Sequence, residues 1–388
     1  MDRVKIKQGL KKIKREYLLK EINTGGFHTE RKLLVFESDD WGSIRMPSGE
    51  IYEKLVSIED PVDKDPFTKF DSLESEEDVK ALLKALENFR DKNGRNPVVT
   101  ANFAVANPDF RKIEEGKFES YYYEPFTKTY ERYPSHRGSF IELNKAVRKG
   151  VIFPQFHCRE HLNVPRWMRD LKSGKDEVRR AFDYNMISTA SSFDKDNKFA
   201  YMDSFNLSNN EDASYMPSVL KEGLELFEDI FGFKSKSFIA SCYVWDDDLE
   251  EELFKLGIEF IQGGRVQLVP RPEKQGSFYD ERRHCIGQKN KRGQIYLVRN
   301  CDFEPAWNPD YDWVERCIEE IEHAFKYKKP ATVSTHRLNY MGFIHENNRE
   351  KNLGLLSNLF EKVLEKWPDI EFLTTVELGD LIKTNGNN

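Results

Sequence analysis

The regular alternation of short β-rich runs with amphipathic stretches is the feature that most restricts how this chain can fold. After residue 30, runs rich in Val, Ile, Phe and Thr are separated for the most part by stretches of helical periodicity. The eight β-rich runs lie at residues 32–37, 97–103, 151–156, 236–241, 258–262, 295–300, 331–335 and 370–374. The clearest helical stretches lie at residues 76–90, 143–149, 219–230, 247–256, 313–327 and 352–367. Strands that alternate with helices favour a parallel sheet with helices packed on it.

This pattern predicts an α/β fold, a distorted (β/α) barrel of seven or eight strands. A doubly wound open sheet is the alternative. Two connections are longer than a barrel requires, at residues 104–137 and 165–217, and such insertions are usually lids or binding loops, or else disordered. Because no linker-like segment divides the chain, we expect residues 30–385 to form one domain, preceded by a basic helix at residues 1–29.

The composition indicates a soluble globular protein without a nucleic-acid partner. Hydrophobic residues make up 38% of the 388 residues and charged residues 33%, which leaves ample material for a core. The net charge is −7, and Lys and Arg are scattered among acidic residues, so no basic stripe is visible. The five cysteines form no CxxC pair, which argues against a disulfide framework and for a reducing compartment. We therefore expect a cytoplasmic protein.

The basic N-terminal segment is predicted to be an ordinary helix. Charged residues interrupt each of its apolar runs, which excludes a secretory signal and a transmembrane segment. Its apolar residues fall roughly along one face, at Val4, Ile6, Leu10, Ile13 and Tyr17. Such a helix can pack on the domain, which is the favoured interpretation, or contact a membrane surface.

Two histidines four residues apart, His157 and His161, end the third β-rich run. If a helix starts there, both rings share a face and can turn toward one point. A catalytic zinc ion usually takes three protein ligands and a water molecule, so this pair needs a carboxylate. Asp39 and Asp40 follow the first run and can supply one ligand and one general base. Taken separately, a solvated turn explains the Asp pair, and packing or capping explains the histidines.

His336 follows the seventh β-rich run and is a candidate general acid. Active sites of (β/α) barrels lie at the carboxyl ends of the strands, so this ring is expected on the same face as the metal ligands. Imidazole is the side chain best tuned to release a proton near neutral pH. The alternative is a structural histidine whose ring is buried in the core with its hydrogen bonds made there.

The order of these motifs resembles that of the polysaccharide deacetylase family, also called the NodB-homology family. The resemblance implies that Asp40, His157 and His161 bind a divalent metal, most readily Zn²⁺. It also implies that Asp39 is the base and His336 the acid. The activity it implies is a metal-dependent hydrolase that removes acetyl groups from an N- or O-acetylated sugar or polysaccharide through metal-activated water.

Departures from the family pattern suggest a divergent branch with its own substrate. The first motif reads ESDDWG instead of TFDDG, the second reads HCREH, and ASCYVW replaces the family's Arg-x-Pro-Tyr segment. An Arg of that segment normally orders the base. Asp39 therefore needs another partner, for which Arg45, Arg159 and Arg299 are candidates. Asp302 is a loose match to the carboxylate that orients the acid.

Several aromatic and polar residues near the predicted strand ends are candidates for binding a carbohydrate. Aromatic rings can stack on sugars, and amide or guanidinium groups can bind hydroxyls, although each residue also has an ordinary structural explanation. The candidates are Trp41, Asn102, Trp245, Arg337 and Asn339, with Tyr243 and the tyrosines at 121–123 as further possible stacking residues.

Two other functions stay open from the sequence. A glycoside hydrolase on a related barrel needs two carboxyl groups about 5 to 10 Å apart. The neighbours Asp39 and Asp40 do not easily provide this separation, so another acid such as Glu304 would be required. A non-catalytic carbohydrate-binding protein that keeps the metal as a structural element is the third option.

Overall fold

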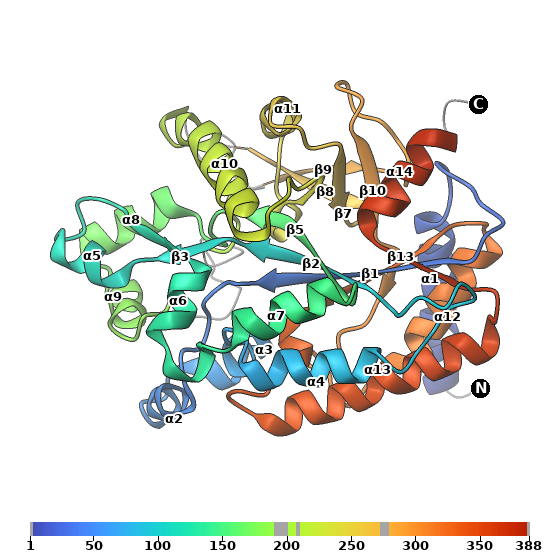
Figure 1. Cartoon of the computed structure of the whole chain (residues 1–388), viewed down its shortest axis with the longest axis horizontal. Helices are drawn as coiled ribbons and strands as arrows, with labels where there is room; N and C mark the ends of the chain where they lie inside the picture. The colour runs from blue at the N-terminus through green and yellow to red at the C-terminus, as the bar shows by residue number, and fades with distance from the viewer. Residues whose placement is uncertain (1–2, 190–200, 207–209, 272–278, 386–388) are drawn as a thin grey trace.

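A curled parallel sheet forms the centre of this computed structural model, which describes residues 3–189, 201–206, 210–271 and 279–385 (Figure 1). The strand order is β10-β7-β6-β5-β2-β1-β12-β11, and β13 also pairs with β1. All pairings in this sheet are parallel. The strands are β1 (Leu33–Trp41), β2 (Val99–Ala104), β5 (Ile152–Cys158), β6 (Ser237–Ile239), β7 (Phe260–Gly263), β10 (Ile295–Val298), β11 (Cys301–Asp302), β12 (Ala331–His336) and β13 (Glu371–Leu373).

The two ends of the strand order meet because β10 and β11 belong to one stretch of chain. The Arg299 amide donates a hydrogen bond to the Gly263 carbonyl at 2.9 Å, and the Asn300 amide donates to the Thr332 carbonyl at 3.1 Å. Between these two residues, the chain stops pairing with β7 and begins to pair with β12. The distorted barrel predicted from the sequence is confirmed, and each of the eight predicted runs contributes to it.

Helices cover the outer face of the sheet and bury its apolar side chains. In Figure 1, α4, α7 and α13 lie on one side of the sheet and α10, α11 and α14 on the other. Helix α4 begins with a capping box in which Ser75 and Asp78 satisfy each other's backbone amides. The main helices are α4 (Glu76–Leu86), α7 (Ser139–Arg148), α10 (Asn210–Phe231), α11 (Asp247–Lys255), α12 (Trp313–Lys326), α13 (Glu346–Lys366) and α14 (Thr375–Asn385). The largest apolar cluster fills the space between the strands and all of these helices except α14, whose apolar residues belong to a separate cluster.

The long connections contain regular structure that periodicity did not predict. In Figure 1 they gather at the end of the molecule toward which β1 and β2 point. Their elements are β3 (Ala106–Pro108), α5 (Phe110–Glu115), β4 (Tyr123–Pro125), α6 (Phe126–Arg132), α8 (Val164–Ser173) and α9 (Asp176–Asp183). Residues 190–200 and 207–209 of the second connection lie outside the described residues. The inserted segments are thus placed at the carboxyl ends of the strands.

Smaller elements complete the chain. The short helices after β1 are α2 (Gly49–Ser57), η1 (Pro61–Asp63) and α3 (Pro66–Lys69). Single 3₁₀ turns lie at η2 (Pro134–His136), η3 (Ser241–Tyr243) and η4 (Arg337–Tyr340). An antiparallel pair that the sequence did not reveal is formed by β8 (Val266–Pro270) and β9 (Tyr279–Arg283).

The N-terminal helix α1 (Arg3–Ile22) lies against α12. Arg15 donates to the Tyr311 hydroxyl at 2.7 Å and forms an ion pair with Glu319 at 3.1 Å. The helix ends earlier than residue 29, and contact with a membrane surface stays a prediction. Among the described residues, no helix combines the length and the apolar composition needed to cross a bilayer.

Candidate metal centre and active site

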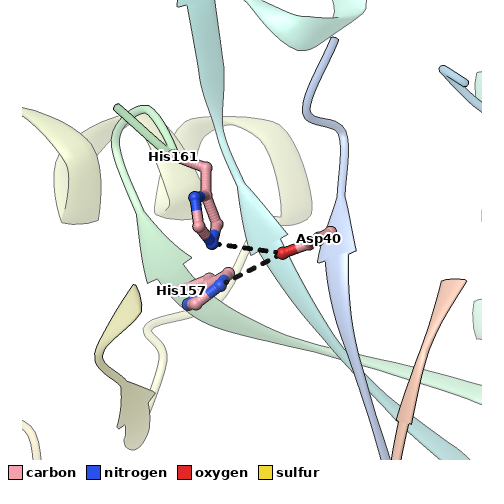
Figure 2. A group of neighbouring side chains, drawn as sticks. All are labelled: Asp40, His157 and His161. Carbon is pink, nitrogen blue, oxygen red and sulfur yellow. Dashed lines mark ion pairs between the residues drawn. The ribbon is translucent and has the colours of Figure 1, made fainter. Parts of the chain in front are cut away.

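One carboxylate and two imidazoles converge at the carboxyl ends of β1 and β5 (Figure 2). The Nε2 atom of His161 lies 3.2 Å from Oδ1 of Asp40, and that of His157 lies 3.5 Å from the same oxygen. The ligand atoms of the three residues all lie within 4.8 Å of one another, and all three side chains are buried. The set that the sequence predicted as metal ligands is therefore brought together by the fold.

A β-bulge brings the two adjacent aspartates to the same side. In a regular strand, successive side chains point to opposite faces. Asp40 has a left-handed backbone conformation with φ of 74°, and the pairing of β1 with β2 shifts register between Ser38 and Trp41. As a result Asp39 and Asp40 both line one cavity. Strain of this kind is typical of functional sites.

The two histidines are held differently from what their spacing predicted. His157 belongs to β5, but His161 lies in a bend, and α8 begins only at Val164, so the predicted helix starting at the histidines is wrong. The bend brings the two rings to a centroid distance of 4.8 Å. Nδ1 of His157 lies 2.8 Å from the Ile239 carbonyl oxygen. Because a carbonyl oxygen can only accept a hydrogen bond, Nδ1 is the donor, and in the neutral ring Nε2 carries the lone pair.

The donor set fits a divalent metal ion. Burial lowers the pKa of His161 to about 3, so the ring is neutral, which is the form that binds metals. Burial disfavours the charge of Asp40, yet the neighbouring His161 and Arg45 hold the pKa of that carboxyl well below its ordinary value. One carboxylate with two imidazoles suits zinc with an open position, and also other divalent ions.

The base candidate Asp39 is held by Arg299. Nη1 of Arg299 donates to Oδ2 at 2.6 Å, Nη2 donates to Oδ1 at 2.7 Å, and Asn102 donates to Oδ1 at 2.8 Å. Burial raises the pKa of Asp39, but the charge and hydrogen bonds of Arg299 outweigh it, and the pKa is lowered to about 2. Of the three candidate arginines, Arg45 instead pairs with Asp40 at 3.1 Å and Arg159 with Glu160 at 2.7 Å.

The acid candidate His336 is oriented by Glu304. Its Nδ1 lies 2.6 Å from Oε1 of Glu304, whose other oxygen accepts from Asn339 at 2.7 Å. Asp302, the loose match in the sequence, pairs with Arg316 at 2.9 Å instead, so that expectation is wrong. Burial lowers the pKa of His336, but the Glu304 carboxylate outweighs it and the pKa rises to about 9. Because Nδ1 is engaged by Glu304, Nε2 is the ring nitrogen that can exchange a proton with a ligand in the cavity, which His336 lines.

A cavity of about 770 Å³ opens above these groups. Beside His336, its wall contains two aromatic rings, Phe67 at a centroid distance of 5.3 Å and Trp307 at 5.5 Å. Trp307 is 47% exposed. Seven of the other lining residues have large apolar side chains, namely Ile44, Met46, Met186, Ile187, Met202, Leu268 and Trp313. Pockets of this size accommodate a ligand much larger than an acetyl group.

The five residues predicted to contact substrate are buried and do not line the cavity. Trp41 has no exposed surface and donates to Ser38 at 2.9 Å, while Trp245 donates to Glu250 at 3.0 Å. Neither ring is placed to stack on a ligand, because packing against the core covers it. Asn102 instead donates to the base candidate Asp39 itself, and Asn339 donates to Glu304, the partner of the acid candidate.

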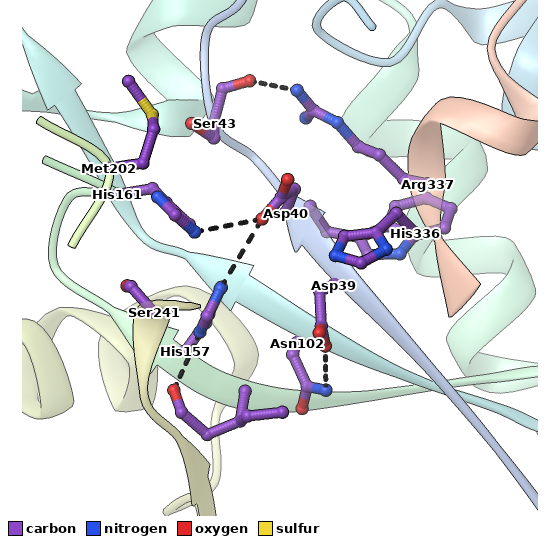
Figure 3. Close-up of polar contacts among 12 residues, drawn as sticks. Asp39, Asp40, Ser43, Asn102, His157, His161, Met202, Ser241, His336 and Arg337 are labelled. Atoms are coloured by element: carbon purple, nitrogen blue, oxygen red, sulfur yellow. Dashed lines mark hydrogen bonds and ion pairs between the residues drawn. The ribbon is translucent and has the colours of Figure 1, made fainter. Parts of the chain in front are cut away.

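Arg337, the fifth of these residues, is a buried structural cation. It donates to Asp71 and Glu74, each at 2.9 Å, and to the Ser43 carbonyl (Figure 3). It therefore ties η4 to the segments after β1. The tyrosines at 121–123 are likewise absent from the cavity lining described, whereas Tyr243 does line it.

Sequence reasoning missed the residues that shape the cavity mouth. Phe67 and Trp307 lie in loops and short helices, and neither falls in a motif. The run FEPAWNP after β11 carries the one usable signal, since an acid and an aromatic residue directly follow a strand end. From the sequence, Glu304 is a candidate only for the second acid of the glycosidase alternative.

No protein-family model matches the chain, and no curated protein matches it. Solved structures do resemble it. A protein from Mycobacterium smegmatis with a provisional description as a polysaccharide deacetylase shares 9% identity over 93% of this chain and 94% of its own, with a TM-score of 0.46. PuuE allantoinase shares 9% over 92% and 93%, with a TM-score of 0.45. The α-amylase AmyC from Thermotoga maritima shares 9% over 90% and 74%, with a TM-score of 0.44. Likenesses this weak assign neither family nor activity.

Proposed function

We propose that this chain is a metal-dependent hydrolase that cleaves the amide or ester bond of an acylated sugar, the chemistry of a carbohydrate deacetylase. One observation carries the proposal. At the base of a single cavity, Asp40 meets His157 and His161 while Asp39 is held ionised beside them and His336 lines the same space. Three ligands, a base and an acid are the parts that such hydrolysis needs.

In the proposed hydrolysis, the metal ligands, Asp39 and His336 have separate roles. A divalent ion, with Zn²⁺ the first choice, would polarise the acyl carbonyl and acidify water at the open position. Asp39 accepts a proton from the attacking water, and Arg299 keeps that carboxylate ionised and oriented. His336 donates a proton to the leaving nitrogen or oxygen while Glu304 fixes its ring. These steps release a carboxylic acid and a free amine or alcohol.

The wall beside His336 supports a sugar as the leaving group. Trp307 presents an exposed ring 5.5 Å from His336, and stacking on such a ring suits the apolar face of a sugar. Asp302 and Arg316 line the same cavity and carry groups that bind hydroxyls. These residues support the proposal of a carbohydrate substrate, and they differ from the five that the sequence suggested.

The glycosidase alternative is disfavoured by the surroundings of Glu304. Both of its oxygens are engaged, by His336 and Asn339, and the residue is buried. A general acid for glycosidic cleavage must reach the bridging oxygen. Asp39 and Asp40 are adjacent in the chain and are committed to Arg299 and to the imidazoles. Of the other acids that line the cavity, Asp302 pairs with Arg316, and Asp65 accepts a hydrogen bond from the Phe67 amide.

Metal content of the purified protein tests the proposal most directly. We expect about one divalent ion per wild-type chain and a loss of metal in His157→Ala. His284→Ala is the matched control, because it removes a buried imidazole outside the site and leaves metal content unchanged. Equal metal in wild type and His157→Ala would overturn the proposal.

Asp39→Asn separates an enzyme from a binding protein that keeps a structural metal. As an enzyme, the variant retains metal but loses acid release from acylated sugars by at least about 100-fold, since a base typically contributes 10²–10⁴-fold. Retained turnover in Asp39→Asn would remove Asp39 from the mechanism. Absence of turnover in the metal-loaded wild type on every acylated sugar, with sugar binding intact in both proteins, would favour the binding protein.

A further inference from the structure

Methionines gather on one wall of the cavity. Three of the chain's seven methionines, Met46, Met186 and Met202, line it, together with Ile44 and Ile187. Thioether side chains are unbranched and adapt to flexible apolar ligands. None of these five side chains can hydrogen-bond a sugar hydroxyl effectively. This wall, which we call the methionine wall, is therefore suited to hydrocarbon.

The methionine wall reaches the metal ligands at Met202. Arg45 connects the two, because one of its terminal nitrogens lies 3.1 Å from Oδ2 of Asp40 and the other contacts the sulfur of Met202. In Figure 3, Met202 lies on the His161 side of Asp40 and His336 on the opposite side. The aromatic residue Trp307 packs beside His336 instead. At Met202 the apolar lining thus approaches the metal ligands, whereas the ring of Trp307 lies beside the acid.

The proposed chemistry determines which part of a substrate meets which wall. The leaving nitrogen or oxygen must lie near His336, which protonates it, and the acyl carbonyl must lie near Asp40 and the two imidazoles. The rest of the acyl group therefore extends away from His336, toward the methionine wall. A single methyl group would leave most of the apolar lining of the cavity uncovered.

We propose that the acyl group removed is a fatty-acyl chain of more than two carbons, attached through an amide or ester to the sugar. This inference rests on the proposed function. Water adds to the acyl carbonyl carbon, the C–N or C–O bond breaks, and the proton passes to the leaving atom. The products are the fatty acid, as its carboxylate, and the free amino or hydroxyl group. Each methylene buried on the wall is worth about a fourfold gain in affinity.

Product binding tests the acyl half of the inference without knowledge of the sugar. Acetate, hexanoate and decanoate are titrated into the zinc-loaded protein by calorimetry. We expect affinity to rise by at least about 100-fold from acetate to decanoate, within the limit of about fourfold per methylene. Equal affinities for the three acids would overturn the inference while leaving the proposed function intact.

Turnover of N-acylglucosamines with chains of two, four, six and eight carbons distinguishes the two proposals. Rising kcat/KM with chain length supports the inference. A maximum at the acetyl compound overturns it and retains the hydrolase. Absence of hydrolysis of all four compounds by the metal-loaded protein overturns the proposed function, and the inference with it.

A substitution in the methionine wall, compared with a matched control, tests where the acyl chain binds. Met202→Trp fills part of the methionine wall and should reduce the ratio of decanoate to acetate affinity at least tenfold. Met168→Trp is the matched control, because Met168, like Met202, packs half-buried against the apolar cluster that contains Ile44 and Ile187, but is not among the residues lining the cavity. A general loss of folding lowers both affinities together and leaves their ratio unchanged. An unchanged ratio in a folded Met202→Trp protein would place the chain elsewhere and overturn the assignment.

Discussion

Replacement of Arg299 by Gln should move the acid limb of the activity profile to higher pH. In the native protein, Arg299 gives both of its terminal nitrogens to Asp39, at 2.6 and 2.7 Å, and both residues are buried. Without the guanidinium, burial of Asp39 is no longer offset, and its pKa rises above the ordinary value of 3.8. A base must be ionised to accept a proton, so activity should fail at a higher pH.

The magnitude follows from the pKa of Asp39. It lies at about 2, against an ordinary 3.8, and each pH unit corresponds to about 1.4 kcal/mol, so the surroundings favour the carboxylate by roughly 2.5 kcal/mol. Because this pKa is lowered, the stabilisation of the fold is present above pH 3.8 and is lost as the pH falls through about 2. We expect the acid limb of kcat/KM to rise by about 2 pH units in Arg299→Gln.

The assay is the pH profile of kcat/KM at saturating metal, with acid release from the best N-acylglucosamine as the readout. Arg299 also donates to the buried Glu37 at 2.6 Å, so its removal leaves a second carboxylate unpaired. The double variant Glu37→Gln/Arg299→Gln removes that charge and should recover thermal stability without restoring the acid limb. Arg299→Lys keeps the charge and should shift the limb less.

An acid limb that coincides with that of the wild type, with only the maximal rate lowered, would refute this reasoning. Arg299 would then act through position alone, and the ionisation that controls activity would belong to a group other than Asp39. A limb restored by the Glu37→Gln substitution would point instead to Glu37 as the source of the shift.

Two further predictions concern the acid and the structural cation. Glu304→Gln removes the charge that raises the pKa of His336 to about 9, so the alkaline limb should move to lower pH, as kcat/KM profiles would report. Arg337→Met removes a fully buried cation from two carboxylates and should lower the free energy of unfolding by about 3–5 kcal/mol, measured in urea. Arg111→Met, at an exposed pair, should change it by at most about 0.5 kcal/mol.

A different result would contradict each of these two predictions. An alkaline limb that stays in place in Glu304→Gln would mean that His336 is not the titrating acid. Equal losses of stability in Arg337→Met and Arg111→Met would mean that the buried ion pairs contribute no more than a surface pair.

The sequence by itself determined the succession of strands and which reactive residues follow them. Periodicity is a local property, so it identified eight of the nine strands of the described sheet and placed Asp39 and Asp40 after the first of them. It also placed His157 at the end of the third. Parallel strands end at a common edge, and for that reason residues far apart in sequence could be expected at one site.

The partners of these residues were decided only by the tertiary structure. Arg299 reaches Asp39 because the chain changes strand partner between β10 and β11, and Glu304 reaches His336 across the same edge. The backbone bulge at Asp40 reverses the alternation that local rules predict. Which side of a strand or loop is covered depends on the elements that pack against it, and no local pattern carries that information. The same holds for Trp41. Its ring lies in the core and not in the cavity, because neighbouring elements pack over it.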